Sequence, residues 1–88
     1  MSSPEPQKTW QLYIILCSDG SLYTGISTDV ERRLAQHAAG SGAKYFRGRA
    51  PQKVVYLEKG HNRSSASRRE AEIKKLSPRE KRRLIASS

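Results

Sequence analysis

The chain has 88 residues, 35% of them hydrophobic, which is enough for one small domain built on a single core. Lys and Arg number 17 against 8 Asp and Glu, and the resulting net charge of +9 is typical of proteins that bind nucleic acids. The longest apolar run, Leu12–Cys17, is far shorter than the ~20 residues of a membrane span, and no secretory signal is visible. A single cysteine excludes an internal disulfide and a thiolate metal cluster, so we expect a protein of the cytoplasm without membrane contact.

Residues 1–9 are polar and contain two prolines, which predicts a flexible lead-in to one domain over residues 10–86. Within Gln11–Cys17 both alternating faces are apolar, as in a central strand that is covered on both sides. The turn Ser18–Gly20 then leads into a return strand at Ser21–Ile26.

Two lengths of this hairpin loop remain open from the residues alone. A two-residue Asp-Gly loop places Tyr13 and Tyr23 on opposite faces of the sheet. A three-residue loop, with Gly20 in the left-handed region, instead pairs Tyr13 with Gly25 and places both tyrosines on one face. The register decides between them, because a one-residue slip turns every side chain to the other face.

A capping box with Thr28 as N-cap and Glu31 at its third helical position predicts a helix that runs to about Ala39 and ends at Gly40. Its expected apolar stripe is Val30, Leu34 and Ala38. Arg33 and His37 are four residues apart on the neighbouring stripe, either as solvated side chains or as part of a site.

Residues 44–69 contain 8 Lys and Arg and a single acidic residue, and they include a basic loop over 40–51. Such a concentrated charge favours a polyanionic partner over a merely solvated surface. Tyr45 and Phe46 in this loop either stack on nucleobases or hold the loop against the core. The expected contacts to nucleic acid are Lys44, Tyr45, Arg47, Arg49, Arg63 and Arg69.

A third strand is predicted at Val54–Glu58, and a second helix begins within Asn62–Ser65 and runs to about Leu76. A third helix starts at Ser77, with proline and glutamate at its first and third positions and Leu84 and Ile85 facing inward.

The second helix places Arg69 and Glu70 on the same face as the apolar Ala66 and Ile73. A carboxylate facing a sheet costs free energy unless it is paired or binds a cation. Glu70 is therefore either one half of a structural salt bridge, with Arg69, Arg33 or another base, or a functional group. The sequence has no phosphate-binding glycine loop and too few ligands for a closed zinc site.

Several segments, in order and covering residues 10–86, resemble the GIY-YIG nuclease superfamily, most closely its small single-domain bacterial members, the UPF0213 group. The matching segments are 11–13, 22–37, 40–45, 54–58 and 67–76, with the motif triads at Gln11–Tyr13 and Tyr23–Gly25. Gln11 and Leu12 replace the glycine and isoleucine of the first triad.

The resemblance implies an α+β fold in which three helices flank a three-stranded antiparallel sheet, with both tyrosines on one face. It also implies a catalytic site made of Tyr13, Tyr23, Arg33, His37 and Glu70. Glu70 is the residue that matches the family's metal-binding glutamate, so one Mg²⁺ or Mn²⁺ ion is the expected cofactor.

The expected function is metal-dependent hydrolysis of phosphodiester bonds in DNA, in repair or recombination. The alternative is a non-catalytic module that binds DNA or RNA through the same basic surface. No additional DNA-binding domain is visible in these residues, so target choice falls to this domain or to a protein partner.

Overall fold

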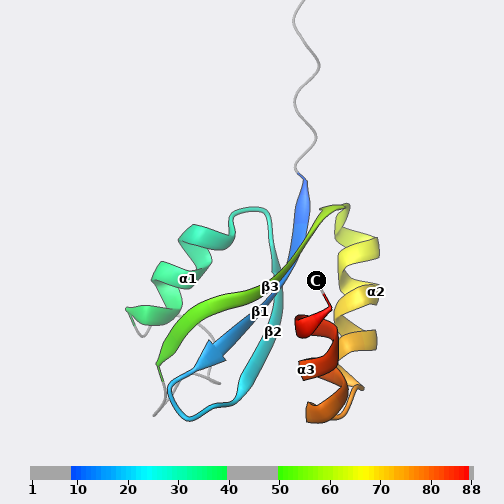
Figure 1. Cartoon of the computed structure of the whole chain (residues 1–88). Coiled ribbons are helices and arrows are strands. Elements are labelled where there is room, and N and C mark those ends of the chain that lie inside the picture. Colours follow the sequence, from blue (N-terminus) through cyan, green and yellow to red (C-terminus); the bar gives the residue numbers. More distant parts are fainter. Residues whose placement is uncertain (1–8, 40–49, 88) are drawn as a thin grey trace, which may run out of the picture.

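In the computed structural model, which describes residues 9–39 and 50–87, three strands form one antiparallel sheet with the order β2-β1-β3. The strands are β1 (Trp10–Cys17), β2 (Leu22–Ser27) and β3 (Pro51–His61). The helices are α1 (Val30–Ala38), α2 (Arg63–Lys74) and α3 (Pro78–Ala86). Figure 1 shows α1 on one side of the sheet and α2 and α3 on the other. The predicted α+β fold is therefore confirmed, and none of the three helices is long and apolar enough to cross a membrane.

The central strand β1 contributes to two cores because its alternating side chains point to opposite faces of the sheet. Tyr13, Ile15 and Cys17 are buried on the face that α1 covers, together with Val30 and Leu34 of that helix. Leu12 and Ile14 are buried on the other face, against Ile73 of α2 and against Leu84 and Ile85 of α3. The prediction of a central strand covered on both sides is confirmed.

The hairpin between β1 and β2 has the three-residue loop. Tyr13 pairs with Gly25 and Ile15 with Tyr23, so the two tyrosines share a face. Gly20 has a φ of 85°, and the Cys17 N–H donates to the Ser21 carbonyl at 2.9 Å. Glycine adopts this left-handed conformation without the steric cost of a Cβ, and this fixes the register of the hairpin.

Helix α1 begins one residue later than predicted. Asp29 is the N-cap, and its side chain accepts a hydrogen bond from the Arg32 N–H at 3.1 Å, so the choice of Thr28 was wrong. The inward stripe also differs, because His37 is buried and Ala38 is exposed. His37 is three residues after Leu34 and Ala38 is four, and both spacings keep a side chain on the same helical face. The structure places His37, rather than Ala38, toward the sheet. The predicted end at Gly40 lies outside the described residues.

Strand β3 is longer than predicted, running from Pro51 to His61 rather than over Val54–Glu58. The extra residues are mostly polar, because β3 is an edge strand and none of its residues is fully buried. Its register against β1 shifts near its end, where Gly60 has a φ of 82°. This irregularity is typical of a β-bulge. The capping boxes of α2, at Asn62, and of α3, at Ser77, are both present.

Candidate active site

Two tyrosines on the α1 side of the sheet form the centre of the candidate site. Tyr13 is only 1% exposed, and its ring centroid lies 6.3 Å from that of Tyr23, with the ring planes at 43°. Gly25 lies opposite Tyr13 in the sheet, and a Cβ at this position would come within 2.6 Å of the Tyr13 hydroxyl oxygen. Glycine is therefore required at Gly25 because the ring of Tyr13 occupies the space of a side chain.

Helix α1 supplies the next two groups. His37 is 3% exposed, and its Nε2 lies 3.4 Å from the Tyr13 hydroxyl oxygen. Its ring also makes an edge-to-face contact with Tyr23, at a centroid distance of 5.4 Å. Arg33, one turn earlier, is exposed and donates to Gln36 Oε1 at 3.3 Å. The histidine is thus a packed member of the tyrosine cluster rather than a solvated side chain.

The charges around Tyr13 connect it to the remaining predicted residues. Burial raises the pKa of Tyr13 to about 12, the charges of Tyr23 and Glu70 also raise it, and Arg33 acts in the opposite direction through its charge and a hydrogen bond. Burial and the nearby Arg33 charge lower the pKa of His37. At neutral pH Tyr13 therefore keeps its proton while His37 is neutral.

Glu70 lies on α2, and its side chain is 24% exposed. Its Oε2 is 3.1 Å from Nζ of Lys74, which is four residues later and 54% exposed. Among the residues that the structure describes, this carboxylate forms its ion pair with Lys74, one helical turn away, rather than with Arg69 or Arg33. Helical pairs with this spacing contribute only about 0.3–0.5 kcal/mol, so the carboxylate can exchange the lysine for another cation.

The donor chemistry at Glu70 fits a hydrated Mg²⁺ or Mn²⁺ ion. Mg²⁺ commonly takes one or two carboxylates, keeps several waters and completes its shell with substrate phosphates. Within residues 9–39 and 50–87, no group of three or more His, Cys, Asp or Glu side chains is placed to enclose a metal. A metal at this carboxylate would therefore depend on water and phosphate oxygens for its other ligands.

The predicted nucleic-acid contacts separate into two groups. Lys44, Tyr45, Arg47 and Arg49 lie outside the described residues. Arg63 is exposed in the first turn of α2, with its guanidinium carbon 5.9 Å from the ring centroid of Trp10. Arg69 is half-buried, and its guanidinium contacts Glu58 at 3.0 Å and Glu72 at 3.1 Å. Arg63 is thus the better placed of these two to meet a phosphate.

A second polar cluster, which the sequence interpretation missed, joins the end of β3 to α2. The Glu58 carboxylate accepts hydrogen bonds from the Tyr56 hydroxyl at 2.5 Å and from Arg69 Nε at 3.0 Å, and His61 Nε2 lies 2.9 Å from it. Burial opposes ionisation of Glu58, but these hydrogen bonds outweigh it and lower its pKa. The cluster fixes the helical turn that contains Glu70. The sequence could have indicated this cluster, because Tyr56 and Glu58 are two residues apart and therefore lie on the same face of a strand.

The buried neutral histidine predicts that stability falls below neutral pH. An unfolded histidine has a pKa near ~6.5. Because the pKa of His37 is lowered in the folded state, the unfolded chain binds the proton first as the pH falls through this value. The stabilising effect is complete above about pH 6.5 and is lost as the pH falls toward the folded-state pKa. The free energy of unfolding, measured with urea, should fall less between pH 7.5 and pH 5.5 in His37→Gln than in the wild type. Equal losses in the two proteins would contradict this assignment.

Comparison with known proteins places this arrangement in a family. A family model described as the GIY-YIG catalytic domain matches residues 9–83. A UPF0213 protein of Natronomonas pharaonis is 52% identical over 75 residues, which cover 85% of this chain and 88% of that protein. A UPF0213 protein of Desulfotalea psychrophila is 47% identical over 87 residues, which cover 97% of this chain and 79% of that protein.

Solved structures agree with these sequence matches. The solution NMR structure of a UPF0213 protein from Bacillus halodurans has a TM-score of 0.60 at 45% identity, covering 91% of this chain and 85% of that one. A solution NMR structure from E. faecalis has the same TM-score at 39% identity. The family model spans most of the chain and includes both tyrosines, the α1 residues and Glu70, and the chain therefore belongs to the GIY-YIG family, a nuclease superfamily.

Proposed function

We propose that this protein is a divalent-metal-dependent endonuclease that hydrolyses phosphodiester bonds in DNA. The observation that carries the proposal is the cluster in which His37 of α1 contacts the buried Tyr13 hydroxyl of β1 and the ring of Tyr23 of β2. Packing and hydrogen bonding bring Tyr23 and His37 together with Tyr13, and electrostatic coupling connects Tyr13 to Arg33 and Glu70. Hydroxyl, imidazole, guanidinium and carboxylate groups together match the needs of phosphodiester cleavage, which requires proton transfer and stabilisation of negative charge.

Arg33 is proposed to bind the non-bridging oxygens of the scissile phosphate. Its guanidinium is permanently charged, and its planar array of donors matches the geometry of a phosphate. The Arg33 side chain is exposed, so a phosphate can approach it while Tyr13 remains buried. The charge stabilises the transition state, in which negative charge accumulates on these oxygens.

The proton roles follow from the charge states of the buried groups. Tyr13 keeps its proton at neutral pH and acts as a hydrogen-bond donor that positions the phosphate or the attacking water. We assign to Tyr23 the acceptance and relay of the proton from the attacking water. Neutral His37 contacts the Tyr13 hydroxyl and the Tyr23 ring, so it orients Tyr13 and has a nitrogen that can hold a proton.

Glu70 is proposed to hold the metal ion. A hydrated Mg²⁺ or Mn²⁺ at this carboxylate would supply Lewis-acid stabilisation of the negative charge on the leaving oxygen. The chain itself contributes a partly covered oxygen donor on a helix that the Glu58 cluster holds against the sheet.

Removing the competing lysine should strengthen metal binding. Lys74→Met leaves the Glu70 carboxylate without its cationic partner, and a helical pair of this kind contributes about 0.3–0.5 kcal/mol. The Kd for Mg²⁺ or Mn²⁺, measured by NMR titration without nucleic acid, should therefore fall about twofold. Lys75→Met changes the neighbouring exposed lysine and is the matched control. If Lys74→Met and Lys75→Met have the same Kd for the metal ion, the ion does not bind at Glu70.

The substrate is proposed to be DNA met in repair or recombination in the cytoplasm, with a protein partner that directs the enzyme to its target. The net charge of +9 favours a polyanion, and the exposed Arg63 adds a cation on α2. Binding should weaken steeply as salt rises, because each phosphate contact releases condensed counterions.

The proposed activity is tested by incubating the protein with single-stranded, duplex and branched DNA, with Mg²⁺ or Mn²⁺ and then with a chelator. The expected result is cleavage of at least one DNA form that the chelator abolishes. Structured RNA is run in parallel, and cleavage of RNA alone would assign the activity to RNA. Salt-sensitive binding to every substrate, without cleavage under any metal condition, would remove the nuclease proposal.

That last outcome would support the alternative, a module that binds DNA or RNA without cutting it. Two observations favour this alternative. Gln11 and Leu12 stand where the first motif triad has glycine and isoleucine, and Lys74 already neutralises the Glu70 carboxylate. The contact between buried Tyr13 and buried His37 favours the enzyme, because binding alone does not require buried proton-transfer groups.

A further inference from the structure

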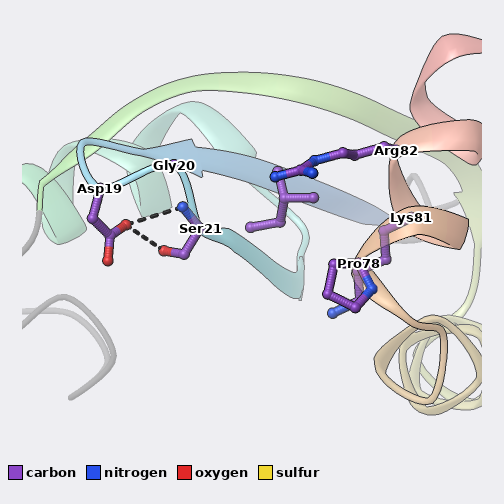
Figure 2. Close-up of a pocket in the computed structure, with 7 residues that line it drawn as sticks. Asp19, Gly20, Ser21, Pro78, Lys81 and Arg82 are labelled. Atoms are coloured by element: carbon purple, nitrogen blue, oxygen red, sulfur yellow. Dashed lines mark hydrogen bonds between the residues drawn. The ribbon is translucent and has the colours of Figure 1, made fainter.

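A groove lies between the tip of the β1–β2 hairpin and helix α3, away from the tyrosine cluster. Two adjoining pockets make up the groove, with volumes of about 400 and 380 Å³, and they share Gly20, Leu22 and Arg82. Figure 2 shows the first pocket, in which Arg82 and Lys81 extend from the helix while Asp19 and Ser21 lie across from them on the hairpin. Pockets of roughly 300–1,000 Å³ are the size that holds ligand groups.

The floor of the groove is aliphatic. It is lined by four partly buried side chains from three strands and a helix: Leu16, Leu22, Val55 and Ile85. The last three belong to the core on the α2 and α3 side of the sheet, so the groove is the open edge of that core. The partly exposed aliphatic side chains of the floor leave apolar surface that another apolar surface can remove from water.

The rim of the groove is basic. Lys81 and Arg82 line the first pocket, and Arg82 also lines the second. The acidic residue of the lining, Asp19, turns its carboxylate to the hairpin, where Oδ1 accepts hydrogen bonds from the Ser21 N–H at 3.0 Å and the Ser21 hydroxyl at 2.6 Å. The groove thus offers positive charge along one edge and an aliphatic surface beneath it.

We propose that this groove is a docking site for an acidic amphipathic segment of a protein partner. Aliphatic side chains of the segment would fill the floor, and its Asp or Glu side chains would pair with Lys81 and Arg82. Nucleic acid is the weaker occupant, because stacking of bases uses aromatic side chains and the lining residues include none. An amphipathic helix laid into an apolar groove is a common mode of peptide recognition.

No residue of the candidate active site lines the groove. The tyrosines and His37 lie on the α1 face of the sheet, whereas Leu22, Val55 and Ile85 lie on the opposite face. The proposal therefore stands whether or not the chain cleaves DNA.

The test uses two synthetic 14-residue amphipathic peptides with the same leucine face, one with glutamates and one with lysines on its polar face. Each is titrated into the full ¹⁵N- and methyl-labelled chain and followed by NMR. The glutamate peptide should shift the methyl signals of Leu22, Val55 and Ile85 and bind at least 10-fold more tightly than the lysine peptide. Replacing the leucines of the glutamate peptide with alanine should raise its Kd at least 10-fold, because charge alone does not fill the aliphatic floor.

Variants on exposed positions test the location. Arg82→Glu and, separately, Ala86→Glu should each weaken the glutamate peptide at least fivefold, because each puts a like charge beside the groove. Arg68→Glu makes the same charge reversal on α2, outside the groove lining, and should change the Kd by less than twofold. The proposal is overturned if both peptides bind equally, or if their shifts lie outside the groove. It is equally overturned if a 14-nucleotide single-stranded DNA shifts the groove methyls more strongly than the glutamate peptide does.

Discussion

Replacing Glu70 with glutamine is expected to lower metal-dependent cleavage of DNA by roughly 100- to 1,000-fold, the effect of removing one charge-stabilising group from an active site. Glutamine keeps the shape of the side chain but loses the negative charge that attracts a hard divalent cation. Within residues 9–39 and 50–87 the change removes the weak ion pair with Lys74, so the fold should persist. Initial cleavage rates at saturating Mg²⁺ or Mn²⁺ measure the effect.

A matched control comes from the same helix. Glu72 lies two residues further along α2, is 60% exposed and pairs with Arg69. Glu72→Gln makes the same chemical change on a different face and should alter the cleavage rate by less than about threefold. Circular dichroism should show both variants folded.

The affinity for DNA, measured without metal, distinguishes a metal-binding role of Glu70 from a general effect of its charge on DNA binding. Glu70→Gln removes a negative charge, so its affinity for DNA without metal should equal or exceed that of the wild type. If the variant binds DNA but no longer cleaves it, the carboxylate acts in the chemical step. Metal-dependent cleavage at the wild-type rate in Glu70→Gln would refute the assignment of the ion to this residue.

The elements with strong local signals were predictable from the sequence. Gly20 in the hairpin loop, the capping box at Ser77 and the two apolar faces of β1 each fix local structure through the backbone or through alternation. The failures lie where neighbouring residues compete. Thr28 and Asp29 are both good N-caps, and residue preference does not distinguish them; in the structure Asp29 caps the helix.

The candidate site was predictable only in part. Placing Tyr13 and Tyr23 on one face needed the correct hairpin register, which the family resemblance selected and the residues alone left open. The pair of Glu70 with Lys74 has a spacing that any helix brings together, whereas the pair of Arg69 with Glu58 depends on how α2 packs against β3. Arg69 thus pairs with Glu58, eleven residues earlier in the chain, and this removes it from the partners available to Glu70.

Gly25→Ala is expected to damage both the fold and the site. The added Cβ would lie 2.6 Å from the Tyr13 hydroxyl oxygen and 2.7 Å from its Cζ, distances at which the ring must move. Overpacking of this kind lowers the free energy of unfolding by about 1–3 kcal/mol. For a domain of this size that corresponds to a fall in Tm of roughly 5–20 °C. The shifted hydroxyl also leaves its position beside His37, so any cleavage should fall with it.

A double-mutant cycle identifies the cause of that damage. In a Tyr13→Leu background the hydroxyl and ring carbons that the methyl group meets are absent, so Gly25→Ala should cost at least 1 kcal/mol less in urea unfolding than in the wild type, a coupling expected of residues in contact. Gly60→Ala is the matched control. Gly60 has a φ of 82° with no atom within 4 Å of the added Cβ, so its cost of about 1–2 kcal/mol is backbone strain and should be the same in both backgrounds. Equal costs of Gly25→Ala in the two backgrounds would show that the glycine is needed for its backbone rather than for the space that Tyr13 fills.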